Sequence, residues 1–183
     1  MKPEEFDSPG VPPATPEQIN PYISKINTIL KELGSSRVCE KLPEKVEGAE
    51  VLRNKVIVVV DDDIEVLERF VPHLVAATEG NARFIRYTSQ KLEALAGEIS
   101  DPKPDIILLD YKLSSMLTGE DVTESLIANG IDSLIIGFST ADLTLSRKLF
   151  QGAGAFDAIN KNQFSPQNSI KELADLIAAQ ESK

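Results

Sequence analysis

The chain has 183 residues, of which 29 are acidic and 19 are lysine or arginine, giving a net charge of -10. This length allows one well-filled hydrophobic core. The acidic balance argues against nucleic acid as a direct partner, because phosphate binding needs a basic face. The single cysteine, Cys39, cannot form an internal disulfide, and no apolar run approaches the roughly 20 residues that span a bilayer. The sequence therefore predicts a cytoplasmic protein without a membrane segment.

The N-terminal part is predicted to contain one short helix. Residues 1–19 hold five of the eleven prolines and are expected to form a flexible arm. A helix is expected over 20–34, with Asn20 as N-cap and Gly34 at the left-handed C-terminal position. Its apolar stripe consists of Tyr22, Ile23, Ile26, Leu30 and Leu33.

This helix is too short to persist alone in water, so its stripe must dock somewhere. The candidates are the main domain, a second copy of the chain in a homodimer, or another protein. Residues 35–53 show no clear pattern and are interpreted as a linker.

From residue 54 to 183, apolar runs and amphipathic segments alternate five times. Strands are expected over 55–60, 82–88, 103–110, 132–139 and 155–160, and helices over 64–75, 89–99, 119–130, 141–152 and 165–180. Ser89 and Ser165 are expected to cap their helices, and Pro72 to kink the first one. Such alternation predicts an α/β domain with a doubly wound, five-stranded parallel sheet, preceded by the helical extension.

The polar residues that follow these strands are expected to meet at one edge of the sheet, where ligands bind in such folds. They are Asp61, Asp62, Asp63, Asp110, Ser139, Thr140 and Lys161. Adjacent carboxylates raise one another's pKa values unless a cation compensates. Hard carboxylate oxygens suit Mg²⁺, and a carboxylate beside a lysine can act as a nucleophile towards a phosphoryl group. A solvated acidic turn or a helix cap is the alternative for the three consecutive aspartates.

Four segments, VVVDDD, IILLDYKL, IIGFSTA and AGAFDAINK, resemble the signature segments of response-regulator receiver domains of two-component signalling, in order, over about residues 54–180. The resemblance implies a flavodoxin-like (βα)5 fold and a phosphoacceptor at Asp110. It further implies that Asp61, Asp62 and the backbone carbonyl of Lys112 bind Mg²⁺, and that Ser139 and Lys161 contact the phosphoryl group. Such a domain is a self-phosphorylating and self-dephosphorylating switch rather than a turnover enzyme.

The resemblance also implies partners. A histidine kinase or a histidine phosphotransfer protein would supply the phosphoryl group, and output would run through protein–protein contacts or a phosphorelay. Two departures leave the output switch open. Asn162 stands where a proline commonly follows the lysine, and Ala158 stands where an aromatic residue is usual, with Phe156 two residues earlier.

Two other functions remain open from the sequence. In a haloacid-dehalogenase-like phosphohydrolase, Asp61 would be the nucleophile of an Asp-x-Asp motif. That motif usually continues with threonine or valine two residues after the second aspartate, where this chain has Glu65. In a pseudo-receiver, the domain would act by binding alone. His73, the sole histidine, has no histidine or cysteine partner nearby in the sequence and is assigned a structural role.

Overall fold

The computed structural model describes residues 20–162 and 164–182. Its elements are α2 (Pro21–Glu32), η1 (Ala49–Leu52), β1 (Ile57–Asp61), α3 (Ile64–Ala77), β2 (Ala82–Arg86), α4 (Leu92–Ser100), β3 (Ile106–Asp110), α5 (Gly119–Ala128), β4 (Leu134–Ser139), α6 (Leu143–Gly152), β5 (Asp157–Asn160) and α7 (Pro166–Glu181). The flexible arm predicted over 1–19 lies outside the described residues. Among the described helices, none is both long and apolar enough to cross a membrane.

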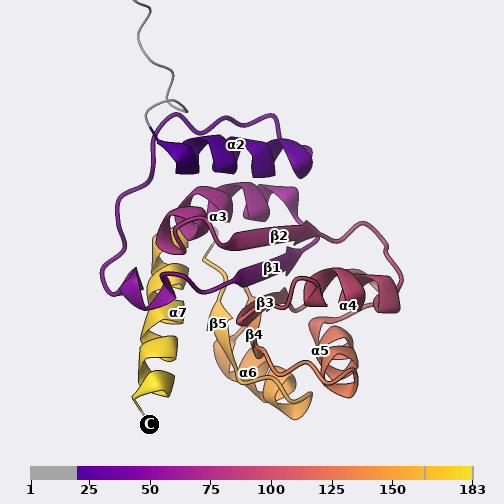
Figure 1. Ribbon diagram of the computed structural model, residues 1–183. Helices are drawn as coiled ribbons and strands as arrows, with labels where there is room; N and C mark the ends of the chain where they lie inside the picture. The colour runs from indigo at the N-terminus through magenta and orange to yellow at the C-terminus, as the bar shows by residue number, and fades with distance from the viewer. Residues whose placement is uncertain (1–19, 163, 183) are drawn as a thin grey trace, which may run out of the picture.

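The five strands form one parallel sheet in the order β2-β1-β3-β4-β5. The predicted doubly wound, five-stranded parallel sheet is therefore confirmed. Every residue of β1 and β3 is buried, as expected for β-branched and leucine-rich runs that are covered on both faces. Because parallel strands need crossover connections, each strand is followed by a helix that packs back on the sheet (Figure 1).

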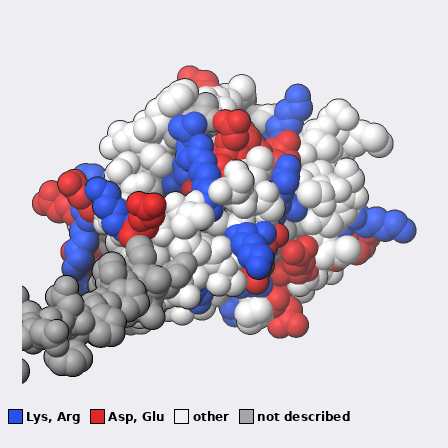
Figure 2. All heavy atoms as spheres, turned by 90° about the horizontal axis from the view of Figure 1, so that it is seen from above, with Lys and Arg blue, Asp and Glu red and all other residues white. Residues whose placement is uncertain are grey.

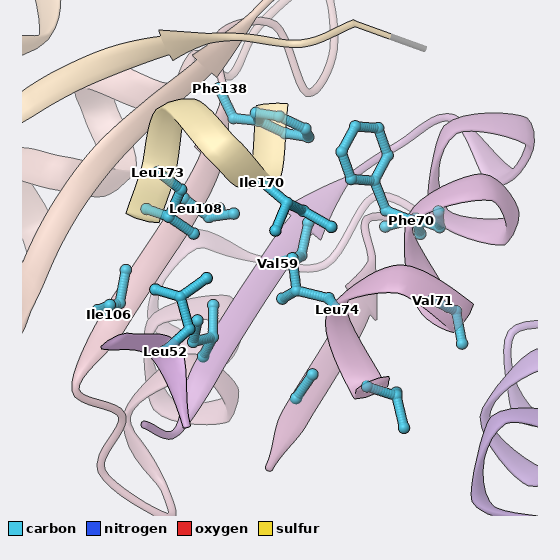
Figure 3. Packing of buried hydrophobic residues seen from close by; sticks show 14 of the residues in the cluster. Leu52, Val59, Phe70, Val71, Leu74, Ile106, Leu108, Phe138, Ile170 and Leu173 are labelled. Carbon is cyan, nitrogen blue, oxygen red and sulfur yellow. The ribbon is translucent and has the colours of Figure 1, made fainter. Parts of the chain in front are cut away.

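Two hydrophobic clusters cover the two faces of the sheet. On the first face, Leu74 of α3 and Ile170 of α7 lie beside Val59 of β1, and Leu173 lies over Leu108 of β3 (Figure 3). The ring of Phe70 of α3 packs edge-on against Phe138 of β4, with the centroids 4.9 Å apart. On the second face, α4, α5 and α6 contribute Leu95, Val122, Leu126 and Phe150. The alternation of inward side chains along each strand supplies both clusters.

One of the local expectations at the helices is wrong, and another stays a prediction. The helix α3 runs from Ile64 to Ala77 as one element with Pro72 inside it, and the kink expected there stays a prediction. The second helix begins at Leu92 with Lys91 at its N-cap, and Ser89 has a φ of 79° outside the helix, so Ser89 is not its cap. Ser165 does occupy the N-cap position of α7, but its side chain makes no capping hydrogen bond.

The N-terminal helix α2 docks on the main domain. Asn20 caps it by accepting a hydrogen bond from the Tyr22 amide, and Gly34 ends it with a φ of 82°. The apolar side chains of Ile26 and Leu30 are buried against α3, in the same core as the sheet. The stripe that suggested a homodimer is thus already covered within the chain.

The segment over 35–53, interpreted as a linker, also contributes to the core. It contains the single-turn helix η1, which packs against α7. Leu52 of this turn is fully buried. Residues 20–53 therefore form a second layer around α3 and α7, so docking on the main domain is the observed one among the alternatives that the sequence left open.

Candidate functional site

Three residues from three strand ends meet at the carboxyl edge of the sheet. The ammonium Nζ of Lys161, just after β5, lies 2.8 Å from Oδ2 of Asp61 and 2.6 Å from Oδ1 of Asp110. Asp61 ends β1 and Asp110 ends β3, so residues separated by about half of the chain form one buried ion-pair cluster. Hydrogen bonds between charged groups of this kind are short and strong because both partners are ionised.

Asp62 completes an acidic group with these two aspartates. Carboxylate oxygens of Asp61, Asp62 and Asp110 all lie within 4.8 Å of one another, with Asp62 exposed and the others buried. Asp63 points elsewhere, because its side chain caps α3 by accepting a hydrogen bond from the Glu65 amide at 2.9 Å. The helix-cap alternative is thus correct for Asp63 alone.

Burial controls the protonation of this cluster. Burial, together with the smaller effect of the neighbouring Asp110 carboxylate, raises the pKa of Asp61 to about 6 against the opposing attraction of Lys161. Burial likewise raises the pKa of Asp110. Burial alone would lower the pKa of Lys161, but the two carboxylates outweigh it, and the net pKa is raised. The lysine therefore stays an ammonium, and the two aspartates compete for its charge.

Local hydrogen bonds fix the lysine in place. The Lys161 amide donates to the Ser139 carbonyl at 2.7 Å, which ties the end of β5 to the end of β4. The Ser169 hydroxyl donates to the Asn160 carbonyl and accepts from the Asn162 amide, so α7 holds the loop. The Lys161 ammonium also lies 5.8 Å from the centre of the Phe138 ring, within cation–π range.

The predicted hydroxyl residues border the same site. A shallow pocket of about 600 Å³ is lined by Asp62, Asp110, Lys112, Ser139, Thr140 and Lys161, among others. The Ser139 hydroxyl oxygen accepts a hydrogen bond from the Ala141 amide at 3.1 Å. The amide of Lys112 donates to Oδ2 of Asp110 at 3.2 Å. Asp63 also lines this pocket, although its side chain caps α3, whereas Asp61 does not line it and is joined to the site by its ion pair with Lys161.

Sequence analysis missed the aromatic residues beside the site. Tyr111 directly follows Asp110 and also lines the pocket, and its ring packs edge-on against Phe150 with the centroids 6.2 Å apart. Its position directly after Asp110, at the end of β3, was the only signal in the sequence. Ala158 of β5 is fully buried, and Phe156, the residue before β5, is exposed. Among the described residues, Tyr111 and Phe150 of α6 are therefore the aromatic pair beside the site on this face, and β5 contributes no aromatic residue.

The donor set fits Mg²⁺. Three carboxylates and one ammonium leave an excess of two negative charges when all are ionised, which a divalent cation would balance. All side-chain donors are hard oxygens, and the described part of the cluster contains no sulfur or imidazole ligand. Asp61, Asp62 and Asp110 are the side chains that could hold such an ion.

Comparisons with known proteins agree with the fold. No family model and no curated protein matches the chain. Among solved structures, the BeF3-activated DrrB receiver domain superposes with a TM-score of 0.52 at 18% identity, covering 67% of this chain and 96% of that domain. The receiver domain of NtrX from Brucella abortus gives a TM-score of 0.52 at 20% identity, covering 66% and 96%.

A third similar structure is a DNA-binding response regulator of the LuxR family from Staphylococcus aureus, with a TM-score of 0.50 at 17% identity, covering 68% of this chain and 97% of that one. At such identities, the likeness establishes the fold. Five parallel strands in the order β2-β1-β3-β4-β5, wrapped by helices on both faces, match it along nearly the full length of each relative. The chain thus has the flavodoxin-like fold of response-regulator receiver domains.

Proposed function

We propose that the protein is a phosphoacceptor receiver of two-component signalling, with Asp110 as the residue that is phosphorylated. The observation that carries this proposal is the cluster in which Lys161 bridges Asp61 and Asp110. A carboxylate oxygen of Asp62 lies within 4.8 Å of a carboxylate oxygen of each of these two aspartates. A lysine that contacts the acceptor carboxylate is well placed to bind a phosphoryl oxygen once the acceptor is phosphorylated.

In the proposed reaction, a carboxylate oxygen of Asp110 bonds to phosphorus while the bond from phosphorus to the imidazole nitrogen of a donor phosphohistidine breaks. The electron pair of that bond stays on the imidazole, which takes up a proton from water. The product is an acyl phosphate on Asp110. The donor would be a histidine kinase or a histidine phosphotransfer protein.

The surrounding side chains have distinct proposed roles. Asp61, Asp62, Asp110 and the backbone carbonyl of Lys112 would hold Mg²⁺, which neutralises charge on the phosphoryl oxygens. The ammonium of Lys161 offers a point charge to one phosphoryl oxygen. The Ser139 hydroxyl, at the end of β4, offers a hydrogen bond to another. Output would pass through protein–protein contacts or onward transfer of the phosphoryl group.

Burial favours Asp110 over Asp61 as nucleophile. Asp61 has no exposed surface, and its two oxygens accept hydrogen bonds from Lys161 and from the Asp63 amide. Asp110 retains 6% exposure and borders the pocket. The phosphohydrolase alternative needs an accessible Asp61, so the geometry supports it less well.

The test is phosphorylation of the full chain by acetyl phosphate with and without Mg²⁺, with the modified residue mapped by mass spectrometry. We expect a Mg²⁺-dependent adduct on Asp110 that is absent from Asp110→Asn. The exposed Asp132, at the opposite edge of the sheet, provides the matched control Asp132→Asn, which should behave as wild type.

Two results would contradict the proposal. An adduct on Asp61 with continuing phosphate release would identify a phosphohydrolase. A chain that stays unmodified, although it is folded and binds Mg²⁺, would identify a pseudo-receiver that acts by binding alone.

A further inference from the structure

The main chain on either side of Lys161 is held by one hydroxyl group. The Ser169 hydroxyl of α7 donates a hydrogen bond to the Asn160 carbonyl at 2.7 Å and accepts one from the Asn162 amide at 2.9 Å. The Asn160 carbonyl belongs to the peptide group before the Cα of Lys161, and the Asn162 amide belongs to the peptide group after it. A single side chain therefore contacts both peptide groups that flank the lysine.

These contacts fix the backbone conformation of Lys161. Each peptide group is planar, so the directions of two successive groups determine φ and ψ of the residue between them. The Lys161 amide also donates to the Ser139 carbonyl of β4 at 2.7 Å. Because the peptide groups on both sides are anchored, the side chain of Lys161 leaves the main chain in one direction, towards the carboxyl edge of the sheet.

The position of Ser169 requires a group that donates and accepts at the same time. Because β5 is the outermost strand, the outward main-chain groups of Asn160 have no neighbouring strand to pair with. The Asn160 amide bonds to the Glu172 carboxylate of α7 at 3.2 Å, and the carbonyl bonds to Ser169. A hydroxyl can satisfy this carbonyl and the Asn162 amide together, whereas a methyl group can satisfy neither. Ser169 has an exposed fraction of only 2%, so water is poorly placed to replace its hydroxyl.

The ammonium end of Lys161 is held by the acidic cluster. Nζ lies 2.8 Å from Oδ2 of Asp61, 2.6 Å from Oδ1 of Asp110 and 5.8 Å from the centre of the Phe138 ring. Basic and acidic side chains are interspersed over the face seen from the side of α2 (Figure 2), so that face adds no field of one sign that would draw the ammonium away. A flexible four-carbon stem joins the ammonium to the main chain, so a small rotation at the Cα displaces Nζ from both carboxylates.

We propose that Ser169 is a positioning residue for Lys161. It holds the main chain so that the ammonium stays beside the Asp110 carboxylate, where it meets a phosphoryl oxygen. This inference rests on the proposed phosphoryl chemistry and extends the site from the strand ends to α7. A displacement of about 1 Å can lower the rate of a reaction by about 100-fold, so the rate is the quantity that loss of the Ser169 hydroxyl changes.

The first test measures the initial rate at which acetyl phosphate and Mg²⁺ form the Asp110 adduct on the full chain. Ser169→Ala should lower this rate by about 10-fold, because the lysine is held less firmly. Ser169→Thr keeps the hydroxyl and should restore the rate to within about 3-fold of wild type. In the alanine variant the Asn162 amide keeps its longer bond to the Asn160 carbonyl, at 3.1 Å, so the chain should still fold.

Two controls separate positioning from a general loss of stability. Ser182→Ala removes an exposed hydroxyl that donates to the Ala178 carbonyl at the end of the same helix, and should react as wild type. In the Lys161→Gln background the ammonium is absent, so adding Ser169→Ala should lower the remaining rate by no more than about 2-fold. A loss of about 10-fold in both backgrounds would show that Ser169 acts through the fold and not through Lys161.

Exchange of the Lys161 ammonium protons with water tests the position of the lysine without any phosphoryl transfer. It is followed by NMR on the unphosphorylated chain, in wild type and in the serine variants. We expect Ser169→Ala to speed this exchange by about 10-fold or more, because an ammonium released from its carboxylates is open to water. If Ser169→Ala does not fold, Ser169→Cys, whose thiol is a weak donor and acceptor, should change rate and exchange in the same directions.

The outcomes separate this inference from the proposed function. An unchanged rate or an unchanged ammonium exchange in Ser169→Ala would overturn the inference, while a normal Asp110 adduct would leave the proposed function intact. If wild type forms no Asp110 adduct, the proposed function is wrong, and the ammonium exchange alone decides whether Ser169 positions Lys161.

Discussion

The two faces of the sheet are closed in different ways. On the first face, α3 and α7 cover the strands, and α2 adds a second layer over α3 (Figure 1). On the second face, α4, α5 and α6 form a single layer. The first face gains burial by adding another helix, whereas the second gains it by close approach of one aromatic ring to the sheet.

That ring belongs to Phe150, which is fully buried against two glycines. A Cβ at Gly137 of β4 or at Gly119 of α5 would overlap the ring, and a Cβ at Gly119 would also overlap the Asp110 carbonyl. Phe150 in turn contacts Tyr111, the residue after Asp110. The side chains that pack on the second face therefore contact the candidate site through Tyr111, whereas the extra helix on the first face stabilises the fold.

The largest expected effect comes from removing a side chain between the layers of the first face. Ile26→Ala deletes a fully buried side chain of α2 and should lower the free energy of unfolding by about 3 kcal/mol, by lost transfer energy and the cavity left behind. Urea denaturation measures the change. Ser24→Ala, exposed on the same helix, should change it by less than about 0.5 kcal/mol.

Amide hydrogen exchange, measured residue by residue, separates two explanations of the Ile26→Ala result. If α2 belongs to the common core, amides of β1 and β3 should lose protection together with those of α2. Loss of protection confined to residues 20–34 would instead support the sequence-based division into an appended helix and a domain over 54–183.

A smaller effect is expected from added volume on the second face. Gly137→Ala forces the Phe150 ring to move and should destabilise the fold by about 2 kcal/mol. Gly97→Ala is the matched control, because the same change in α4 meets no atom within 4 Å and should stabilise the helix by about 0.5–1 kcal/mol. Adding Phe150→Leu to Gly137→Ala should recover part of the loss. A Gly137→Ala variant as stable as wild type would show that the ring has room to move.

The smallest expected effect comes from a substitution of Asp61, at the carboxyl edge of the sheet. The pKa of Asp61 is about 6 in the folded chain against an ordinary value of 3.8, so the folded state binds its proton more tightly than the unfolded state does. Ionised Asp61 therefore destabilises the metal-free fold above about pH 6, and this cost disappears as the pH falls towards 4.

Asp61→Asn should accordingly stabilise the chain at pH 7.5 in EDTA by about 1–2 kcal/mol, and by close to zero near pH 4. Urea denaturation at the two pH values measures the difference. The exposed Asp175→Asn on α7 serves as the control. If Asp61→Asn stabilised the chain more at pH 4 than at pH 7.5, this would contradict the raised pKa of Asp61. Added Mg²⁺ should stabilise the wild type more than Asp61→Asn, if Asp61 is a ligand.

Much of this architecture was determined by local sequence. Asn20 and Gly34 define the ends of α2 because a side-chain cap and a left-handed glycine each satisfy main-chain groups that the helix leaves free. The alternation of apolar strands and amphipathic helices determined the parallel sheet. Once the sheet is parallel, the residues after its strands must share one edge, so the meeting of Asp61, Asp110 and Lys161 followed from their positions.

Only the tertiary structure decided the rest, because it depends on which surfaces meet. The stripe of α2 has the same periodicity whether it faces α3 or a second chain, so its docking could not be derived from spacing. Asp61, Asp62 and Asp63 are three identical consecutive residues in the sequence. In the structure, Asp61 is buried beside Lys161, Asp62 is exposed and Asp63 caps a helix. Those differences arise from burial and from partners brought together by folding, which no local pattern records.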